Sequence, residues 1–217
     1  MFASVVFDLD GTLLNTIDDL ADSANWVCTQ LGWPTHTVNE YRYFVGNGIP
    51  KLVERFTPEA CRTPETLAKA LALFDERYAA HKADKTAPYA GIREMLQSLQ
   101  QAGVRYGVVT NKDHAAAVAV LAHYFGDLVP CVQGRIDALP PKPAPDTTRL
   151  LMQTLHAEPA ATLFVGDSNV DIATAKAAGL ASCGVLWGFR TLEELQQAGA
   201  DHIAETPLDL QKLILQA

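Results

Sequence analysis

The feature that most constrains this chain is the segment VVFDLDGT, which runs from residue 5 to residue 12. Its leading apolar residues have no helical period, so they indicate a strand buried on both faces, as in a parallel sheet. Asp8 and Asp10 follow where this strand ends, and Gly11 permits a sharp turn after them. Because strands of such sheets place functional groups just beyond their carboxyl ends, the segment predicts both an α/β fold and a site.

The two carboxylates of this segment have two functional interpretations. Alternate residues of an extended segment lie on the same side of it, so Asp8 and Asp10 are neighbours. Their like charges raise the pKa of one of them unless a cation is present. The pair can divide into a nucleophile and a proton carrier, or it can hold a hard cation such as Mg²⁺. A solvated turn is the simpler interpretation, since Asp is common in turns.

The rest of the chain alternates between predicted strands and helices, with one interruption. Strands are expected at 5–7, 104–110, 128–133, 162–165, 182–187 and around 203, with helices between them. This alternation predicts a doubly wound parallel sheet, a Rossmann-like core with right-handed crossovers. Residues 15–85 contain no strand candidate and predict an inserted all-helical cap, whose first helix begins with a capping box of Thr16 and Asp19. Residues 1–14 and 86–217 then form the α/β core.

Composition narrows the classes of partner. The chain carries 17 basic and 25 acidic residues, a formal net charge of −8, which disfavours nucleic acid and anionic membranes. It has neither a signal-peptide pattern nor an apolar run of the roughly 20 residues that a membrane helix needs. Its four cysteines form no CxxC pair, which favours reduced thiols in a cytoplasmic protein. We expect a monomer or homodimer that acts on a small molecule.

Two further segments offer groups that suit a phosphate. The strand expected at 104–110 ends in Thr110 and Asn111, where a hydroxyl and backbone N–H groups at a helix start form an anion cradle. An ordinary N-cap explains these two residues equally well. Lys142 stands between prolines in the segment PPKPAP, which stiffens the loop and favours a fixed positive charge. A solvated lysine is the alternative there.

A second pair of carboxylates follows the strand expected at 162–165. Asp167 lies at its end and Asp171 in the first turn of the next helix. Both side chains can reach a Mg²⁺ ion held near Asp8 and Asp10. For Asp171 a supporting role, including an interaction with the helix dipole, stays open beside direct ligation.

Taken in order, these segments resemble the four motifs of the haloacid dehalogenase superfamily. The motifs are DLDGT from Asp8, then Thr110 with Asn111, then Lys142, then Gly166 and Asp167 with Asp171. The resemblance extends over essentially the whole chain, including a helical cap inserted after the first motif. Because each motif is expected at the carboxyl end of a strand, the order and placement together carry more weight than any one motif.

The resemblance implies an activity and a role for each residue. It implies that Asp8 attacks phosphorus and forms an aspartyl-phosphate, while Asp10 protonates the leaving oxygen and later activates water. It implies that Mg²⁺ is held by the Asp8 carboxylate, the Asp10 backbone carbonyl and Asp167. The phosphoryl oxygens would be held by the three remaining groups, which are the Thr110 hydroxyl, the Asn111 backbone N–H and Lys142.

The resemblance also narrows the reaction. An acid at position 10 is typical of phosphatases and phosphomutases and not of the dehalogenases. Mutases similar to β-phosphoglucomutase carry a cap arginine where this chain has Ile49, although Lys51 and Arg55 lie close by in the sequence. Hydrolysis of phosphate monoesters is therefore the first hypothesis. A mutase, a pyrophosphate or nucleotide phosphatase, and a non-catalytic binding module on the same fold stay open.

The expected cap suggests a substrate. Its segment FVGNG, residues 44–48, is similar to that of the phosphoglycolate phosphatases in this superfamily, so phosphoglycolate is the first expected substrate. Gly46, Asn47 and Gly48 are expected to place backbone N–H groups near the part of the substrate that does not react. An ordinary turn between two helices is the alternative for these three residues.

Overall fold

A computed structural model describes residues 1–216. The chain divides into two compact units, one of Met1–Leu14 with Pro88–Ala217 and the other of Asn15–Ala87. The second crossing between the units thus follows residue 87, where the sequence led us to expect it after residue 85.

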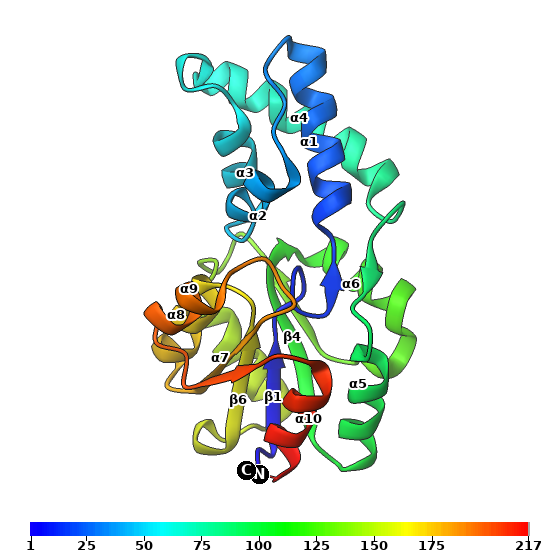
Figure 1. Ribbon diagram of the computed structural model, residues 1–217, viewed down its shortest axis with the longest axis vertical. Coiled ribbons are helices and arrows are strands. Elements are labelled where there is room, and N and C mark those ends of the chain that lie inside the picture. The colour runs from blue at the N-terminus through cyan, green and yellow to red at the C-terminus, as the bar shows by residue number, and fades with distance from the viewer. Residues whose placement is uncertain (217) are drawn as a thin grey trace. The chain divides into compact units, whose positions relative to one another are not determined.

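The first unit is built on one sheet of six parallel strands in the order β5-β4-β1-β6-β7-β8 (Figure 1). The strands are β1 (Ser4–Phe7), β4 (Arg105–Asp113), β5 (Val132–Arg135), β6 (Thr162–Gly166), β7 (Ala181–Val185) and β8 (His202–Ala204). The predicted doubly wound parallel sheet is confirmed.

Both faces of this sheet are covered, which explains the continuous apolar run of β1. Val5 packs into a cluster with side chains of α5 (Ile92–Gln101), α6 (His114–Phe125) and α10 (Pro207–Gln216). Val6 packs into a second cluster with α7 (Asp146–Leu155) and α8 (Asn169–Ala178). Neighbouring residues of a strand point to opposite faces of the sheet. Because helices cover both faces, both valines are fully buried. The unit also contains α9 (Leu192–Gln197) and the short helices η2 (Gly126–Leu128) and η3 (Pro159–Ala161).

The strand order places a topological switch at the centre of the sheet. From β1 the sheet grows to one side through β4 and β5, and then to the other side through β6, β7 and β8. In doubly wound sheets ligands bind beyond the carboxyl ends of the strands at such a switch. The segments that follow β1, β4 and β6 are therefore the ones that can build a site.

The second unit is helical. Its elements are α1 (Ile17–Leu31), α2 (Val38–Phe44), α3 (Ile49–Phe56), η1 (Glu59–Cys61) and α4 (Pro64–His81). Tyr41, Phe56 and Phe74 are its largest fully buried side chains. A separate two-stranded sheet of β2 (Leu14–Asn15) and β3 (Ala87–Pro88) forms where the chain passes between the units. Among residues 1–216, none of the helices combines the length and apolar character that a bilayer-spanning segment requires.

The capping box predicted for Thr16 and Asp19 is wrong. Thr16 precedes α1, but its side chain makes no capping hydrogen bond. Asp19 instead accepts hydrogen bonds from the backbone N–H groups of Lys85 and Thr86 and from the Thr86 hydroxyl. The Asp19 carboxylate is thus directed toward a distant segment and not toward the start of its own helix.

Two strand boundaries differ from the predictions by three residues or more. β4 continues to Asp113 with a register shift after Val109, so Thr110 and Asn111 belong to an irregular strand end and not to a helix start. Asp113 is the N-cap of α6 and accepts from the Ala116 N–H. β5 begins at Val132, because residues 126–128 form η2 and not a strand.

Candidate active site

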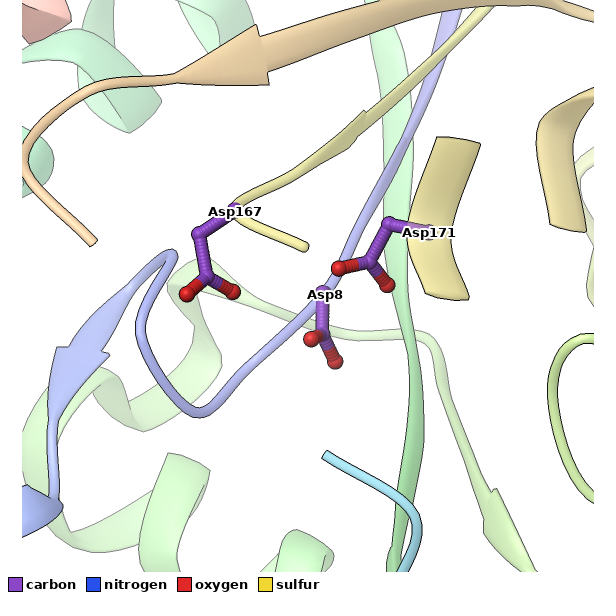
Figure 2. Close-up of side chains that lie close together, drawn as sticks. All are labelled: Asp8, Asp167 and Asp171. Atoms are coloured by element: carbon purple, nitrogen blue, oxygen red, sulfur yellow. The ribbon is translucent and has the colours of Figure 1, made fainter. Parts of the chain in front are cut away.

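Three carboxylates from distant parts of the sequence meet at the switch point. Asp8 follows β1, Asp167 follows β6, and Asp171 lies in the first turn of α8 (Figure 2). All three are buried, and one oxygen of each lies within 4.8 Å of an oxygen of the others. Three of the four residues predicted to bind metal are thus brought together.

Glycines beside the cluster make this close approach possible. A methyl group on Gly11, whose φ is +89°, would overlap the Asp167 carboxylate. A methyl group on Gly166 would overlap the Asp171 side chain, and one on Gly188 would overlap that of Asp167. The cluster therefore requires glycine on three separate segments, and the role of Gly188 was not predicted from the sequence.

A buried lysine lies among these carboxylates. The Lys142 Nζ is 2.8 Å from Asp8 Oδ1 and 2.7 Å from Asp171 Oδ1, and its side chain is 2% exposed. Burial opposes the charge of Lys142, but the neighbouring charges of Asp171 and Asp8 outweigh it and raise the lysine pKa. A lysine fixed in this way stays positive and can face an anion.

The remaining charge favours a cation. Burial and the nearby Asp171 raise the pKa of Asp8 well above its usual value, and the same two causes raise the pKa of Asp167 to about 7. When the three carboxylates are ionised, the ammonium of Lys142 balances only one of their charges. Oxygen donors with an excess of negative charge are the set that a hard divalent cation requires, so the residues present fit a metal ion.

Protein groups hold two of the carboxylates in place. The Phe189 N–H donates to Asp167 Oδ2 at 2.7 Å, and the Thr12 hydroxyl donates to Asp167 Oδ1 at 3.4 Å. Asp171 Oδ2 accepts from the backbone N–H and the hydroxyl of Ser168, in a capping box that begins α8. Both oxygens of Asp171 thus already accept hydrogen bonds, one from Lys142 and one from Ser168.

Asn111 positions Lys142 through its side chain. The Lys142 N–H donates to Asn111 Oδ1 at 2.8 Å, and Asn111 Nδ2 donates to the Lys142 carbonyl at 3.1 Å. The hydroxyl oxygen of the buried Thr110 accepts from the Lys112 N–H at 3.2 Å. The sequence predicted only the backbone of Asn111 as functional, because its amide gives no signal of a partner 31 residues away.

Asp10 lies outside the carboxylate cluster. Lys112 Nζ donates to its two oxygens at 3.0 and 3.3 Å, and the side chains of Lys112 and Asp10 are 6% and 16% exposed. The sequence predicted that the charge of Asp10 acts on Asp8. In the structure the acids whose charges raise the pKa of Asp8 are Asp171 and Asp167. The role of Lys112 was missed, although it directly follows Asn111 in the sequence.

The three cap residues expected to contact substrate form the turn between α2 and α3. Arg55 donates to the Phe44 carbonyl at 2.7 Å and to Asn47 Oδ1 at 2.8 Å, which braces this turn. Lys51 donates to Glu54 at 2.7 Å. Gly46, Asn47 and Gly48 belong to the helical unit, and their contact with a substrate stays a prediction.

Comparison with known proteins identifies the family. The sequence model of the haloacid dehalogenase-like hydrolases matches residues 5–185. The match includes five of the six strands of the core sheet, from β1 to β7, together with the inserted helices, and β8 lies beyond it. The chain belongs to the haloacid dehalogenase-like hydrolase family, and the predictions of this superfamily and of an enzyme are confirmed.

Individual relatives are similar over nearly the whole chain. A protein of Vibrio parahaemolyticus named phosphoglycolate phosphatase is 33% identical over 97% of this chain and 95% of its own length. The crystal structure of a predicted phosphoglycolate phosphatase from Haemophilus somnus has a TM-score of 0.89 at 30% identity, covering 98% of this chain and 97% of that one. CbbY from Rhodobacter sphaeroides, solved in complex with phosphate, has a TM-score of 0.81 at 26% identity, covering 97% and 96%.

Proposed function

We propose that this enzyme is a Mg²⁺-dependent phosphatase that hydrolyses small phosphate monoesters through an aspartyl-phosphate on Asp8. One observation carries the proposal: Lys142 lies 2.8 Å from Asp8, and Asp167 completes a buried oxygen cluster beside the pair. A nucleophilic carboxylate, a fixed cation and a divalent-metal donor set are the groups that phosphoryl transfer requires in one place.

The metal would be held by the Asp8 carboxylate, Asp167 and the Asp10 backbone carbonyl. When bound, Mg²⁺ neutralises phosphoryl charge and keeps the neighbouring carboxylates ionised. Asp171 supports this set, since both of its oxygens already accept from Lys142 and Ser168. Asp171 thereby fixes the lysine that faces the phosphoryl group.

The reaction then divides between the two acids of the first motif. Asp8 attacks phosphorus while Lys142, the Thr110 hydroxyl and the Asn111 N–H hold the phosphoryl oxygens. Asp10 gives a proton to the leaving oxygen and later takes one from the water that attacks the aspartyl-phosphate. Its ion pair with Lys112 keeps the Asp10 carboxylate in one orientation between these two steps.

Phosphoglycolate is the substrate that we propose first. The Vibrio relative is named phosphoglycolate phosphatase, the Haemophilus structure is described as a predicted one, and both match nearly the full length of the chain. A mutase needs a cap cation that grips a second phosphate. Arg55 instead braces the cap turn, and Lys51 pairs with Glu54, so these two side chains have other contacts. This favours hydrolysis over isomerisation.

A comparison of phosphorylated metabolites in the presence of Mg²⁺ tests the proposal. We expect free phosphate from phosphoglycolate, with a higher kcat/KM than for hexose phosphates, nucleotides or pyrophosphate. The isosteric Asp8→Asn variant should lose activity by at least about 10³-fold, because an amide is not a nucleophile for phosphorus. Circular dichroism would verify that this variant folds.

Two results would contradict the proposal. Phosphate release by Asp8→Asn at the wild-type rate would remove Asp8 from the reaction. An isomerised sugar phosphate without release of free phosphate would replace hydrolysis by the mutase reaction.

A further inference from the structure

We propose that Lys112 binds a carboxylate of the leaving group, so that this enzyme selects phosphate esters of α-hydroxy acids. The proposal rests on the function proposed above and deepens it, since it names the residue and the chemical group that define the substrate class. It assigns to Lys112 a contact with substrate in addition to its contact with Asp10.

The position of Lys112 follows from the role of Asp10. A general acid must lie about 2.6–3.2 Å from the oxygen that it protonates. Lys112 Nζ is 3.0 Å from one oxygen of Asp10 and 3.3 Å from the other. The ammonium group and the leaving oxygen would therefore both lie within hydrogen-bond distance of the same carboxylate.

The chemistry of an α-hydroxy acid matches this spacing. In a 2-phospho acid the carboxylate is attached to the carbon that carries the ester oxygen, so the two groups lie side by side. A substrate whose ester oxygen faces Asp10 can turn its carboxylate toward Lys112. An ammonium group has three N–H donors, so contact with Asp10 and contact with a substrate carboxylate are compatible.

Burial makes such a contact selective. The Lys112 side chain is 6% exposed, so water screens its charge little. A substrate carboxylate beside this ammonium group accepts a charge-assisted hydrogen bond, which an uncharged leaving group does not.

The other buried lysine of the site has a different task. Lys142 lies between Asp8 and Asp171, at 2.8 and 2.7 Å, and so faces the phosphoryl group. A substrate with two anionic groups needs a second cation on the side of the leaving group. Lys112 is on that side because it contacts Asp10, the residue that protonates the leaving oxygen.

The test compares two substrates that differ only in the group facing Lys112. One is 2-phosphoglycolate, and the other is 2-hydroxyethyl phosphate, in which a CH₂OH group replaces the carboxylate. In Lys112→Met the ratio of their kcat/KM values should fall by at least about tenfold, since a charge-assisted contact is lost for one substrate only. Lys112→Arg, which keeps the charge, should retain part of the preference.

A binding measurement gives a readout without turnover. Calorimetry on Asp8→Asn and on Asp8→Asn/Lys112→Met should show at least about tenfold weaker binding of phosphoglycolate in the double variant. Binding of 2-hydroxyethyl phosphate should change less. Lys176→Met is the matched control, because it removes the same charge from an exposed lysine that donates to the Ala198 carbonyl.

Equal losses for both substrates would overturn the proposal and leave Lys112 as a positioning residue for Asp10. Phosphate release from other monoesters but not from phosphoglycolate by the wild-type enzyme would also overturn it, while the proposed phosphatase function would stand. Absence of phosphate release from every monoester would instead contradict the phosphatase function itself.

Discussion

At the scale of single residues, the carboxylate cluster depends on side chains that are absent. Gly11, Gly166 and Gly188 each lie where a methyl group would overlap Asp167 or Asp171. Gly11 also has a φ of +89°, which favours glycine. A side chain at this position would therefore both strain the backbone and overlap Asp167. The two effects can be separated by comparison with a glycine that has a positive φ but open space around its Cβ position.

We expect Gly11→Ala to impair catalysis far more than Gly103→Ala. Gly103 has a φ of +74° but open space around its Cβ position, so its substitution adds backbone strain of about 1–2 kcal/mol and nothing else. Gly11→Ala adds the same strain and also displaces Asp167, which can cost about 10²-fold in kcat. Chemical denaturation and steady-state kinetics on both variants would measure this, and equal kcat values would refute the account.

The sequence could locate the acids of the site but not all of their partners. Asp8, Asp10, Asp167 and Asp171 were predicted to come together because parallel strands end at the same edge of a sheet. All of them except the side chain of Asp10 meet in the carboxylate cluster. The amide of Asn111 and the ammonium of Lys112 reach their partners from an irregular end of β4. The register shift there decides which side chain points where, and no local pattern of the sequence indicates it.

At the scale of elements, α1 is tied to the segment that leads out of the helical unit. Asp19 is 2% exposed and accepts from the Lys85 and Thr86 N–H groups and from the Thr86 hydroxyl at 2.7–3.1 Å. Asp22 pairs with the ammonium of the same Lys85 at 2.6 Å, but both of those side chains are more than half exposed. Asp19 thus makes a buried contact and Asp22 an exposed contact with the same segment, so that the two contributions to stability can be compared.

We expect Asp19→Ala to destabilise the protein by about 2–4 kcal/mol, because it leaves buried donors without an acceptor. Asp22→Ala should cost no more than about 1 kcal/mol, since exposed ion pairs contribute little. Urea denaturation of both variants would measure the difference. Similar losses would show that the bonds to Asp19 are not what holds these segments together.

The stability contributed by a second contact between elements, that of Asp201 with Ser182, should depend on pH. Asp201, before β8, accepts from the Ser182 hydroxyl and N–H at 2.7 and 2.9 Å, and these bonds lower its pKa. Because the pKa of Asp201 is lower in the folded state, its ionised carboxylate stabilises the folded protein at pH values above 3.8, the usual pKa of an Asp side chain. This stabilisation is lost as the pH falls below 3.8 and through the lowered pKa. Asp201→Asn should therefore cost about 1 kcal/mol at pH 7 and less at pH 3. A constant difference between the two pH values would contradict this assignment.

Helices could be predicted from the sequence more closely than their capping contacts. Thr191 and Glu194 form a capping box at the start of α9, because both partners lie within one turn. The box of Thr16 and Asp19 failed because donors 66 and 67 residues away take the carboxylate. β5 was placed too early because an apolar run does not distinguish the η2 turn from a strand.

At the scale of the whole molecule, a net charge of −8 opposes the approach of anions, so attraction for a phosphate ester must be local. Lys142 and Lys112 provide it within an acidic chain. The topological switch explains why both can serve one site, since it gathers the ends of β1, β4 and β6. The alternation of strands and helices predicted the doubly wound sheet, whereas the order of its strands is known only from the structure.

Binding of Mg²⁺ should stabilise the molecule. At about 100 times its Kd the ion contributes about 2.7 kcal/mol, which corresponds to a rise in Tm of about 5–10 °C for a chain of this size. The rise should be reversed by a chelator and should be much smaller in Asp167→Asn, while the exposed Asp127→Asn should behave as wild type. Differential scanning calorimetry measures it, and an unchanged Tm would argue against a metal in the carboxylate cluster.

The central claim is that Asp8 accepts the phosphoryl group before water does, and the stereochemistry at phosphorus tests it most directly. A monoester that the enzyme hydrolyses is prepared with a chiral, isotopically labelled phosphoryl group, and the configuration of the phosphate released is determined. Two successive in-line displacements, first by Asp8 and then by water, predict retention of configuration. Inversion would mean that water attacks the substrate directly, and it would contradict the role of Asp8 as nucleophile.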